Sequence, residues 1–246
     1  MSEQWIVPDW PAPARVRSLV TTRRGGVSTG AYASLNLGEH VGDDSRAVAE
    51  NRAQLARRLP SAPRWLNQVH GTTVFCADSE AIGDLPPMAD AAFACQPGVV
   101  CAVMTADCLP VLLCDKAGQV VAVAHAGWRG LQAGVLERTV AAMGCPGAQL
   151  LAYLGPAIGP EAFEVGDEVR AAFLKASDEA VAAFKGLSPG KWLTNIYLLA
   201  RQRLARLGVG AVYGGAYCTV HETERFFSYR RDGVTGRMAS LIWLAD

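Results

Sequence analysis

Two histidines and one cysteine stand where apolar, strand-like runs break into turns marked by glycine or proline. His70 lies in the segment NQVHG, Cys108 in TADCLP and His125 in HAGWRG. Because strand ends from distant parts of a chain can meet in space, two imidazoles and a thiol so placed can converge. Three such ligands suit a tetrahedral zinc site whose fourth position stays open for water, as in catalytic zinc sites.

The same three residues have two other interpretations. In a metal-free thiol enzyme, Cys108 would be the nucleophile and His70 or His125 the base. In a purely structural interpretation, the cysteine is a small buried hydrophobe and the histidines are hydrogen-bonded turn residues. The second histidine favours the metal, because a thiol nucleophile needs only one imidazole base.

Charge and composition argue against several classes of function. The chain has 246 residues, and its 23 Lys and Arg balance its 23 Asp and Glu, so the formal net charge is zero. No block of basic residues stands out, which argues against a nucleic-acid or membrane partner. No apolar run approaches the roughly 20 residues of a membrane-spanning helix. Walker A and Rossmann glycine patterns are also absent from the right strand–helix setting.

Cysteine usage indicates the compartment. Most of the seven cysteines lie inside apolar runs, and no CxxC pair occurs. Such cysteines are typical of reduced thiols in a reducing compartment. The first residues lack the basic and apolar regions of a signal peptide, so we expect none. We therefore expect a cytoplasmic protein, acting as a monomer.

Hydrophobic patterning predicts the elements that position these residues. Helices are expected from the capping residues 43–45 to about residue 59 and over 127–143, 166–175 and 195–207. Strands are expected over 16–22, 72–77, 91–95, 99–104, 111–115, 119–124, 149–154, 211–219, 226–229 and 238–244. Because strands come in runs with helices inserted, an α+β fold with mixed sheets is favoured over a doubly wound sheet.

Domain organisation follows from the same pass along the chain. The best linker candidate, 185–191, is too short and too near the end to divide two domains. We therefore expect a single domain over residues 1–246.

Basic and histidine-containing loops supply further candidates. Arg23 opens the glycine turn RRGGVS, which either lets a ligand approach the backbone or forms a plain hairpin turn. His40 is a candidate for ligand contact, whereas His221 lies in a polar loop and is not expected to act. Arg230 and Arg231 follow two aromatic residues, and they form either a solvated turn or a bidentate grip on phosphate.

The motifs taken together resemble the YfiH family, also described as the laccase-domain or multi-copper polyphenol oxidase family and labelled a peptidoglycan editing factor. The three segments above match, and so do TTRRGGVS at 21–28, SLNLG at 34–38 and VGDD at 41–44. Near the C-terminus, FFSYRRD at 226–232 and TGRMAS at 235–240 also match. The resemblance therefore spans essentially the whole chain.

The resemblance implies a layered α/β/β/α fold of mixed β-sheets in one domain. It implies that His70, Cys108 and His125 bind zinc, or copper, and form the catalytic centre. The implied activity is phosphorolysis of purine nucleosides (adenosine, inosine, guanosine and methylthioadenosine), with adenosine deamination at the same site. Purine nucleosides and phosphate are thus the expected partners. Family loop residues carry over, as candidates for substrate binding, to Arg23, Asn36, Gln68, Asp107 and Arg129.

Two alternative activities stay open, namely copper-dependent polyphenol oxidation and peptidoglycan editing by a thiol hydrolase that uses Cys108 and a histidine. A multi-copper oxidase needs several copper centres and many histidines, and this chain has four histidines in all. One such site could still hold a single copper ion. Phosphorolysis therefore ranks first. One departure from the family is Asn195, where aspartate is expected, but asparagine caps a helix equally well.

Roles within the expected site follow from the chemistry. Phosphorolysis must place an anion near the ribose C1′, and the guanidinium fork suits phosphate, so Arg23 is the first choice and Arg129 the second. Deamination needs a proton carrier, and Asp107 is the only carboxylate beside the expected ligands. Asp107 is alternatively expected to orient a ligand histidine through a hydrogen bond.

Overall fold

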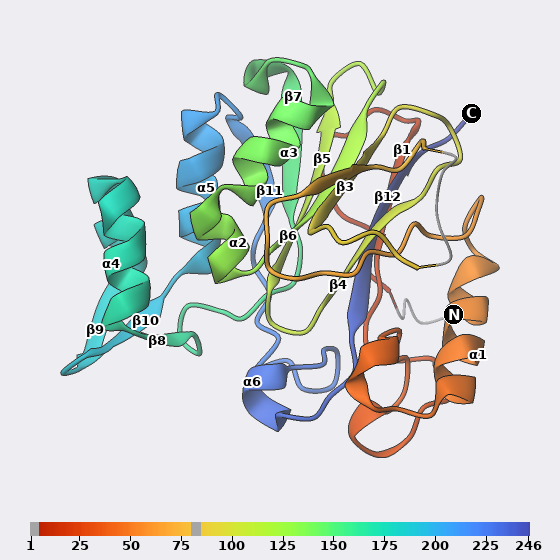
Figure 1. Ribbon diagram of the computed structural model, residues 1–246, viewed down its shortest axis with the longest axis horizontal. Helices are drawn as coiled ribbons and strands as arrows, with labels where there is room; N and C mark the ends of the chain where they lie inside the picture. The colour runs from red at the N-terminus through yellow and green to blue at the C-terminus, as the bar shows by residue number, and fades with distance from the viewer. Residues whose placement is uncertain (1–4, 80–84) are drawn as a thin grey trace.

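The computed structural model describes residues 5–79 and 85–246 and shows two stacked β-sheets covered by helices on their outer faces (Figure 1). The larger sheet has the strand order β11–β7–β5–β6–β3–β2. Its outer pairs are parallel and its inner pairs antiparallel. These strands are β2 (Val74–Cys76), β3 (Ala91–Ala94), β5 (Leu109–Asp115), β6 (Val121–Ala126), β7 (Leu150–Leu154) and β11 (Ala211–Gly214).

The smaller sheet is antiparallel, with the order β1–β12–β4. Its strands are β1 (Val16–Val20), β4 (Cys101–Thr105) and β12 (Met238–Leu244). Because β5 and β6 are buried on both faces, their alternate side chains enter two different cores. Leu113 and Ala124 face the helices, whereas Leu112 and Val123 pack against the smaller sheet.

Helices complete the outer layers. The larger sheet is covered by α2 (Trp128–Ala133), α3 (Val135–Met143) and α5 (Ile196–Arg206), and the smaller sheet by α1 (Ser45–Ala56). Short 3₁₀ turns occupy Gly30–Tyr32, Glu39–Val41, Gly147–Gln149 and Asp178–Ala183. The predicted α/β/β/α layering with mixed sheets is therefore confirmed.

Two helix caps predicted from the sequence are present. Asp44 precedes α1, and its side chain accepts a hydrogen bond from the Arg46 N–H at 2.8 Å. Asn195 precedes α5, and its side chain accepts from the Leu198 N–H at 3.0 Å. Asn195 thus performs the capping role expected for it.

The segment 185–191, the best linker candidate in the sequence, instead forms most of a hairpin. A third sheet has the order β8–β10–β9, with β8 (Glu164–Gly166), β9 (Phe184–Ser188) and β10 (Lys191–Thr194). It extends to one side of the molecule together with α4 (Asp167–Ala176) (Figure 1). The strands are short and β9 is largely exposed, so they lack the apolar runs that indicate buried strands.

Three other predicted elements differ from the structure. The helix expected over 127–143 is two helices, since Gly134 takes a left-handed φ of 102° between them. The strand expected over 211–219 ends at Gly214, where Gly214 and Gly215 both have positive φ. No strand covers 226–229. Phe226 is buried there, but it lies in an irregular loop that leads into α6 (Tyr229–Asp232).

Three further expectations concern membrane-spanning helices, a signal peptide and the state of the cysteines. Within residues 5–79 and 85–246, no helix is long and apolar enough to cross a membrane. The expected absence of a signal peptide concerns a start whose residues 1–4 lie outside the described ranges. All seven cysteines lie within those ranges and are free thiols, as predicted.

Candidate metal centre

The structure brings His70, Cys108 and His125 together at one end of the larger sheet. In the β5–β6 pair, Pro110 lies opposite His125 and Leu109 opposite Ala126, so Cys108 and His125 lie at the same end. His70 comes from the loop that precedes β2. One ligand atom from each of the three residues lies within 4.8 Å of the others, and Cys108 Sγ is 3.7 Å from His70 Nε2.

Asp90, a residue that the sequence analysis missed, supports this group from behind. It is fully buried, and its Oδ1 accepts a hydrogen bond from His125 Nδ1 at 2.8 Å and from the His70 N–H at 2.9 Å. Its Oδ2 accepts from the Gly71 N–H at 2.6 Å and from the Val69 N–H at 3.2 Å. Carboxylates that bind the second nitrogen of a metal-ligating histidine fix its tautomer and orientation. Asp90 therefore leaves Nε2 of His125 as the nitrogen available to a metal.

The only sequence signal for Asp90 is its position as a lone acid directly before the buried alanine-rich strand β3. A buried carboxylate in that position needs polar partners. The sequence does not show which partners it has, because His125 lies 35 residues away.

Backbone geometry around the three residues is specialised. His70 has a φ of 59°, in the left-handed region that few non-glycine residues occupy. Its N–H bond to Asp90 holds it there. A Cβ at Gly127 would lie 2.9 Å from Cys108 Sγ and 3.0 Å from the His70 ring, so only glycine leaves room for the two side chains.

Electrostatics at the group favour the metal-binding form of the thiol. Burial by itself raises the pKa of Cys108, but the charge and hydrogen bonding of His125 and then His70 outweigh it and lower the pKa to about 6. Burial lowers the pKa of His125, whereas Cys108 and then Asp90 raise it to about 9. For Asp90, burial raises the pKa, but the hydrogen bonds from His125 and Gly71 bring it below its ordinary value. The thiol is therefore largely ionised at neutral pH, as a metal ligand must be.

A cavity of about 560 Å³ opens over the three residues, which is a size typical of small-molecule sites. Its apolar lining comes from α2, the segment after β7 and the start of α5. Its polar lining comes from the 3₁₀ turn at His40, the loop before β2, the turn before β5, Arg129 on α2, the start of α6 and the residue before β12. The main lining side chains, besides the three, are His40, Gln68, Asp107, Trp128, Arg129, Ile158, Phe163, Ile196, Tyr229, Arg230 and Arg237.

Three of the five residues expected to bind substrate line the cavity, and two of them, Gln68 and Arg129, make contrasting contacts. Gln68 is bound at both ends to the Met104 backbone, at 2.7 and 2.8 Å, so its amide holds the loop that carries His70. Arg129 is exposed, lies over the Trp128 ring at 4.5 Å, and makes no hydrogen bond or ion pair within the described chain. Arg129 is therefore available to a ligand.

Asp107 also lines the cavity, but both its carboxylate oxygens are occupied. Oδ1 accepts from Thr219 Oγ1 and Oδ2 from the Arg230 N–H, each at 2.6 Å. Its φ of 89° is a left-handed value. Asp107 thus ties the turn before Cys108 to the C-terminal loop. The expected hydrogen bond to a ligand histidine is made by Asp90 instead.

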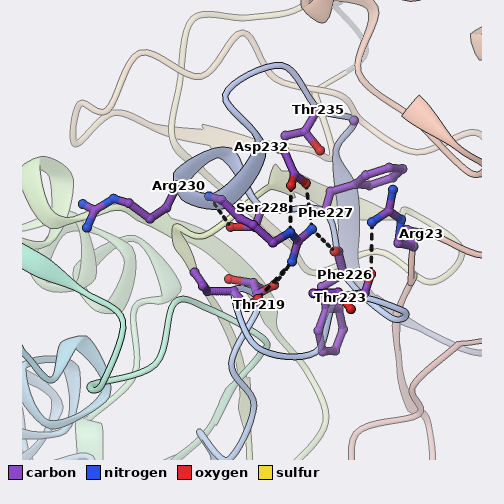
Figure 2. A network of polar contacts seen from close by, with 12 residues as sticks. Arg23, Thr219, Thr223, Phe226, Phe227, Ser228, Arg230, Asp232 and Thr235 are labelled. Atoms are coloured by element: carbon purple, nitrogen blue, oxygen red, sulfur yellow. Dashed lines mark hydrogen bonds and ion pairs between the residues drawn. The ribbon is translucent and has the colours of Figure 1, made fainter. Parts of the chain in front are cut away.

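Arg23 and Asn36 lie outside the cavity lining. The Arg23 side chain donates to the carbonyls of Ala33 at 2.9 Å and Thr223 at 3.0 Å, and lies over the Phe227 ring at 4.8 Å. Figure 2 shows Arg23 and Arg230 on opposite sides of the network of polar contacts that residues 219–235 form near the C-terminus. Asn36 is fully buried. The structure therefore does not bring Arg23 to the place where the sequence analysis put a phosphate.

Comparisons with known proteins agree along the whole chain. A family model described as multi-copper polyphenol oxidoreductase laccase matches residues 17–245. A protein of Pseudomonas aeruginosa named purine nucleoside phosphorylase is 59% identical over 243 residues, which cover 98% of this chain and 99% of that protein. The Escherichia coli purine nucleoside phosphorylase YfiH is 57% identical over 242 residues, covering 97% and 98%.

Solved structures share the fold. Neisseria meningitidis protein NMB0706 superimposes with a TM-score of 0.95 at 57% identity, and 99% of this chain and 100% of that one are covered. YlmD from Geobacillus stearothermophilus superimposes with a TM-score of 0.91 at 32% identity, covering 100% and 98%.

Proposed function

The chain belongs to the family described as multi-copper polyphenol oxidoreductase laccases, and from this membership and the geometry of its site we propose that it is a zinc-dependent purine nucleoside phosphorylase. The observation that carries the proposal is the His–Cys–His group within 4.8 Å beneath a cavity of about 560 Å³. Relatives that cover the whole chain are named for this activity. We propose one catalytic domain over residues 1–246.

The donor set suits a single zinc ion. Two imidazoles and an ionised thiol are common zinc ligands, and three protein ligands leave the open position of a catalytic site. Copper also accepts these donors. However, the described residues contain no second group of metal-ligating side chains. Among the described residues, the additional copper centres of a multi-copper oxidase therefore have no second group of ligands, so polyphenol oxidation ranks behind phosphorolysis.

In phosphorolysis, the bond between ribose C1′ and the purine nitrogen breaks while an oxygen of phosphate bonds to C1′. Zinc, if bound, would supply a Lewis acid. His70, Cys108 and His125 would hold that ion, and Asp90 keeps His125 in the orientation required. The apolar lining accommodates the purine and excludes water, and arginines at the cavity supply positive charge for the phosphate.

Deamination of adenosine to inosine at the same centre is a second, weaker proposal. The observation that favours it is Asp107, the one carboxylate among the described cavity-lining residues. Both of its oxygens already accept short hydrogen bonds, so it is poorly placed to carry a proton. We therefore expect inosine to form more slowly than adenine.

The cellular setting is part of the proposal. Seven free cysteines support a reducing compartment, the cytoplasm. We also propose that the protein acts as a monomer. Size-exclusion chromatography with light scattering tests the oligomeric state.

Two measurements test the function. Metal analysis of protein purified without added metal should give about one zinc per chain. Incubation with adenosine should yield adenine and ribose 1-phosphate only when phosphate is present. Inosine as the main product would support deamination instead. No turnover of any purine nucleoside, or full activity without metal, would overturn the proposal and favour a thiol hydrolase.

Substitutions of two different cysteines, Cys108 in the site and Cys76 outside it, provide a test and its matched control. Cys108→Ala should lose both zinc and phosphorolysis. Cys76→Ala removes an exposed thiol on β2 and should keep both. Loss of zinc in both variants would show that the metal does not report on the proposed site.

A further inference from the structure

Arg237 reaches the cavity from the smaller sheet. Because Met238 at the start of β12 lies opposite Thr105 at the end of β4, the residue before it lies beside the turn that carries Cys108. The Arg237 main chain is fixed on both sides: its N–H donates to Asn36 Oδ1 at 2.9 Å, and its carbonyl accepts from the Leu37 N–H at 3.2 Å. Asn36 thus positions Arg237.

The Arg237 side chain is anchored along one edge only. It passes over Gly38, where a Cβ would lie 2.8 Å from Arg237 Cγ, so a larger residue would displace it. Nη1 donates to the carbonyls of Thr235 at 3.0 Å and Gly236 at 3.1 Å. Within the described chain, Nε and Nη2 make no hydrogen bond. One edge of the guanidinium is therefore held in place while the other is free, which is the arrangement needed for a bidentate contact with an oxyanion.

The charge on Arg237 has no carboxylate partner among the described residues. Its neighbour Arg52 differs, since it pairs with Glu39 at 2.7 Å. Asp107 lies near Arg237, but its oxygens are occupied by Thr219 and the Arg230 N–H. Burial lowers the pKa of Arg237, while the Cys108 thiolate and then Asp107 raise it. A half-buried cation without a partner is costly, and an anion in the cavity would offset that cost.

The two other arginines of the cavity fit the anion less well. Arg129 and Arg230 are both exposed, so solvent screens their charge. Arg230 also directs Nη1 to the carbonyl of Glu164 at 3.0 Å, away from the metal ligands. Arg129 lies over Trp128 and has no second contact to hold its orientation.

We propose that the free edge of Arg237 binds inorganic phosphate inside the cavity, between this side chain and the His–Cys–His group. The inference rests on the proposed function and names the phosphate subsite of that reaction. Phosphate held there lies in the same cavity as the nucleoside, so one of its oxygens can approach C1′. Asn36 acts as a positioning residue, through the main chain of Arg237.

Calorimetric titration of the zinc-loaded enzyme with inorganic phosphate tests the subsite directly. Arg237→Gln should weaken phosphate binding by about tenfold to a hundredfold, because a charge-assisted bidentate contact is lost. Arg237→Lys should also weaken it, since an ammonium lacks the fork. Arg24→Gln is the matched control: Arg24 pairs with Glu224 at 3.4 Å outside the cavity, so phosphate affinity should not change.

Several results of these titrations would overturn the proposed phosphate subsite. It is overturned if the wild type binds no phosphate, if Arg237→Gln binds it with unchanged affinity, or if Arg129→Gln weakens binding more than Arg237→Gln. A parallel titration with adenosine 5′-monophosphate separates the two sources of phosphate. Arg237 dependence seen only with the nucleotide would overturn the assignment to the free anion. If Arg237→Gln does not fold, Arg237→Lys decides, and affinity within about twofold of wild type overturns the subsite.

Kinetics separate this inference from the proposed function. In Arg237→Gln, the KM for phosphate should rise while zinc content and the KM for adenosine stay near wild type. Phosphate binding that depends on Arg237, without turnover of any nucleoside, would overturn the function and leave the subsite standing. Phosphorolysis with phosphate affinity unchanged in Arg237→Gln would overturn the subsite alone.

Discussion

Replacing Asp90 by asparagine tests how the metal centre is built. The two residues have nearly the same shape, but asparagine replaces one acceptor oxygen by an NH₂ donor. In the protein each Asp90 oxygen faces two donors: His125 Nδ1 and the His70 N–H at Oδ1, and the N–H groups of Gly71 and Val69 at Oδ2. Whichever way the asparagine amide is oriented, its NH₂ group faces two N–H groups that need an acceptor.

The magnitude follows from these contacts. At least one buried N–H loses its acceptor, which costs about 1–3 kcal/mol, and the remaining bonds lose their ionic character. We expect Asp90→Asn to lower the free energy of unfolding of the metal-free protein by about 2–4 kcal/mol at neutral pH. Loss of a carboxylate behind a ligand histidine should weaken zinc binding about tenfold to a hundredfold, or about 1.4–2.8 kcal/mol.

Competition with a chelator of known zinc affinity measures the change in zinc affinity. Denaturant unfolding of protein from which a chelator has removed the metal measures the change in the free energy of unfolding. Asp78→Asn is the matched control, because Asp78 accepts backbone N–H bonds from Cys95 and Gln96 but contacts no histidine of the site. It should lose stability and keep zinc affinity. Equal zinc affinity in Asp90→Asn, Asp78→Asn and wild type would refute the role assigned to Asp90.

Three further predictions address the thiol, the glycine and the displaced arginine. In the metal-free protein, alkylation of Cys108 by iodoacetamide should rise with a midpoint at a pH of about 6, because the neighbouring histidines lower the pKa of this thiol; a midpoint near the ordinary value of about 8.5 would contradict the pairing. Gly127→Ala should weaken zinc binding in chelator competition and also lower the stability of the metal-free protein, since the added Cβ crowds Cys108 Sγ at 2.9 Å and the His70 ring at 3.0 Å. Unchanged zinc affinity would mean that the crowding is relieved. Arg23→Ala should lower the free energy of unfolding by about 1–3 kcal/mol, because the hydrogen bonds to two carbonyls and the stacking on Phe227 are lost. The KM for phosphate should stay unchanged. A raised KM would show that Arg23 binds phosphate after all.

Local sequence was sufficient for most of the buried strands and helices and for the residues at the centre of the site. Apolar runs such as Val121–Ala126 favour buried strands, because a strand inside two layers needs apolar side chains on both faces. Caps such as Asp44 act on N–H groups two or three residues away, so they are visible in the sequence. The sequence also singled out the two histidines and the cysteine that the structure brings together, since imidazole and thiol groups can bind a metal wherever they stand in a chain.

Tertiary structure decided which polar side chains support the site. Asp90 receives its role from His125, 35 residues away, and Arg237 is positioned by Asn36 across 201 residues. Arg23 has the side chain that phosphate binding needs, yet its Nε and Nη1 donate to the carbonyls of Ala33 and Thr223, and it lies outside the lining of the cavity. Apolar burial depends mainly on the pattern along the chain, whereas a buried hydrogen bond or charge contact depends on atoms that folding alone brings within about 3 Å. Most of the buried strands and the three candidate metal ligands could therefore be predicted from the sequence, but their supporting contacts could not.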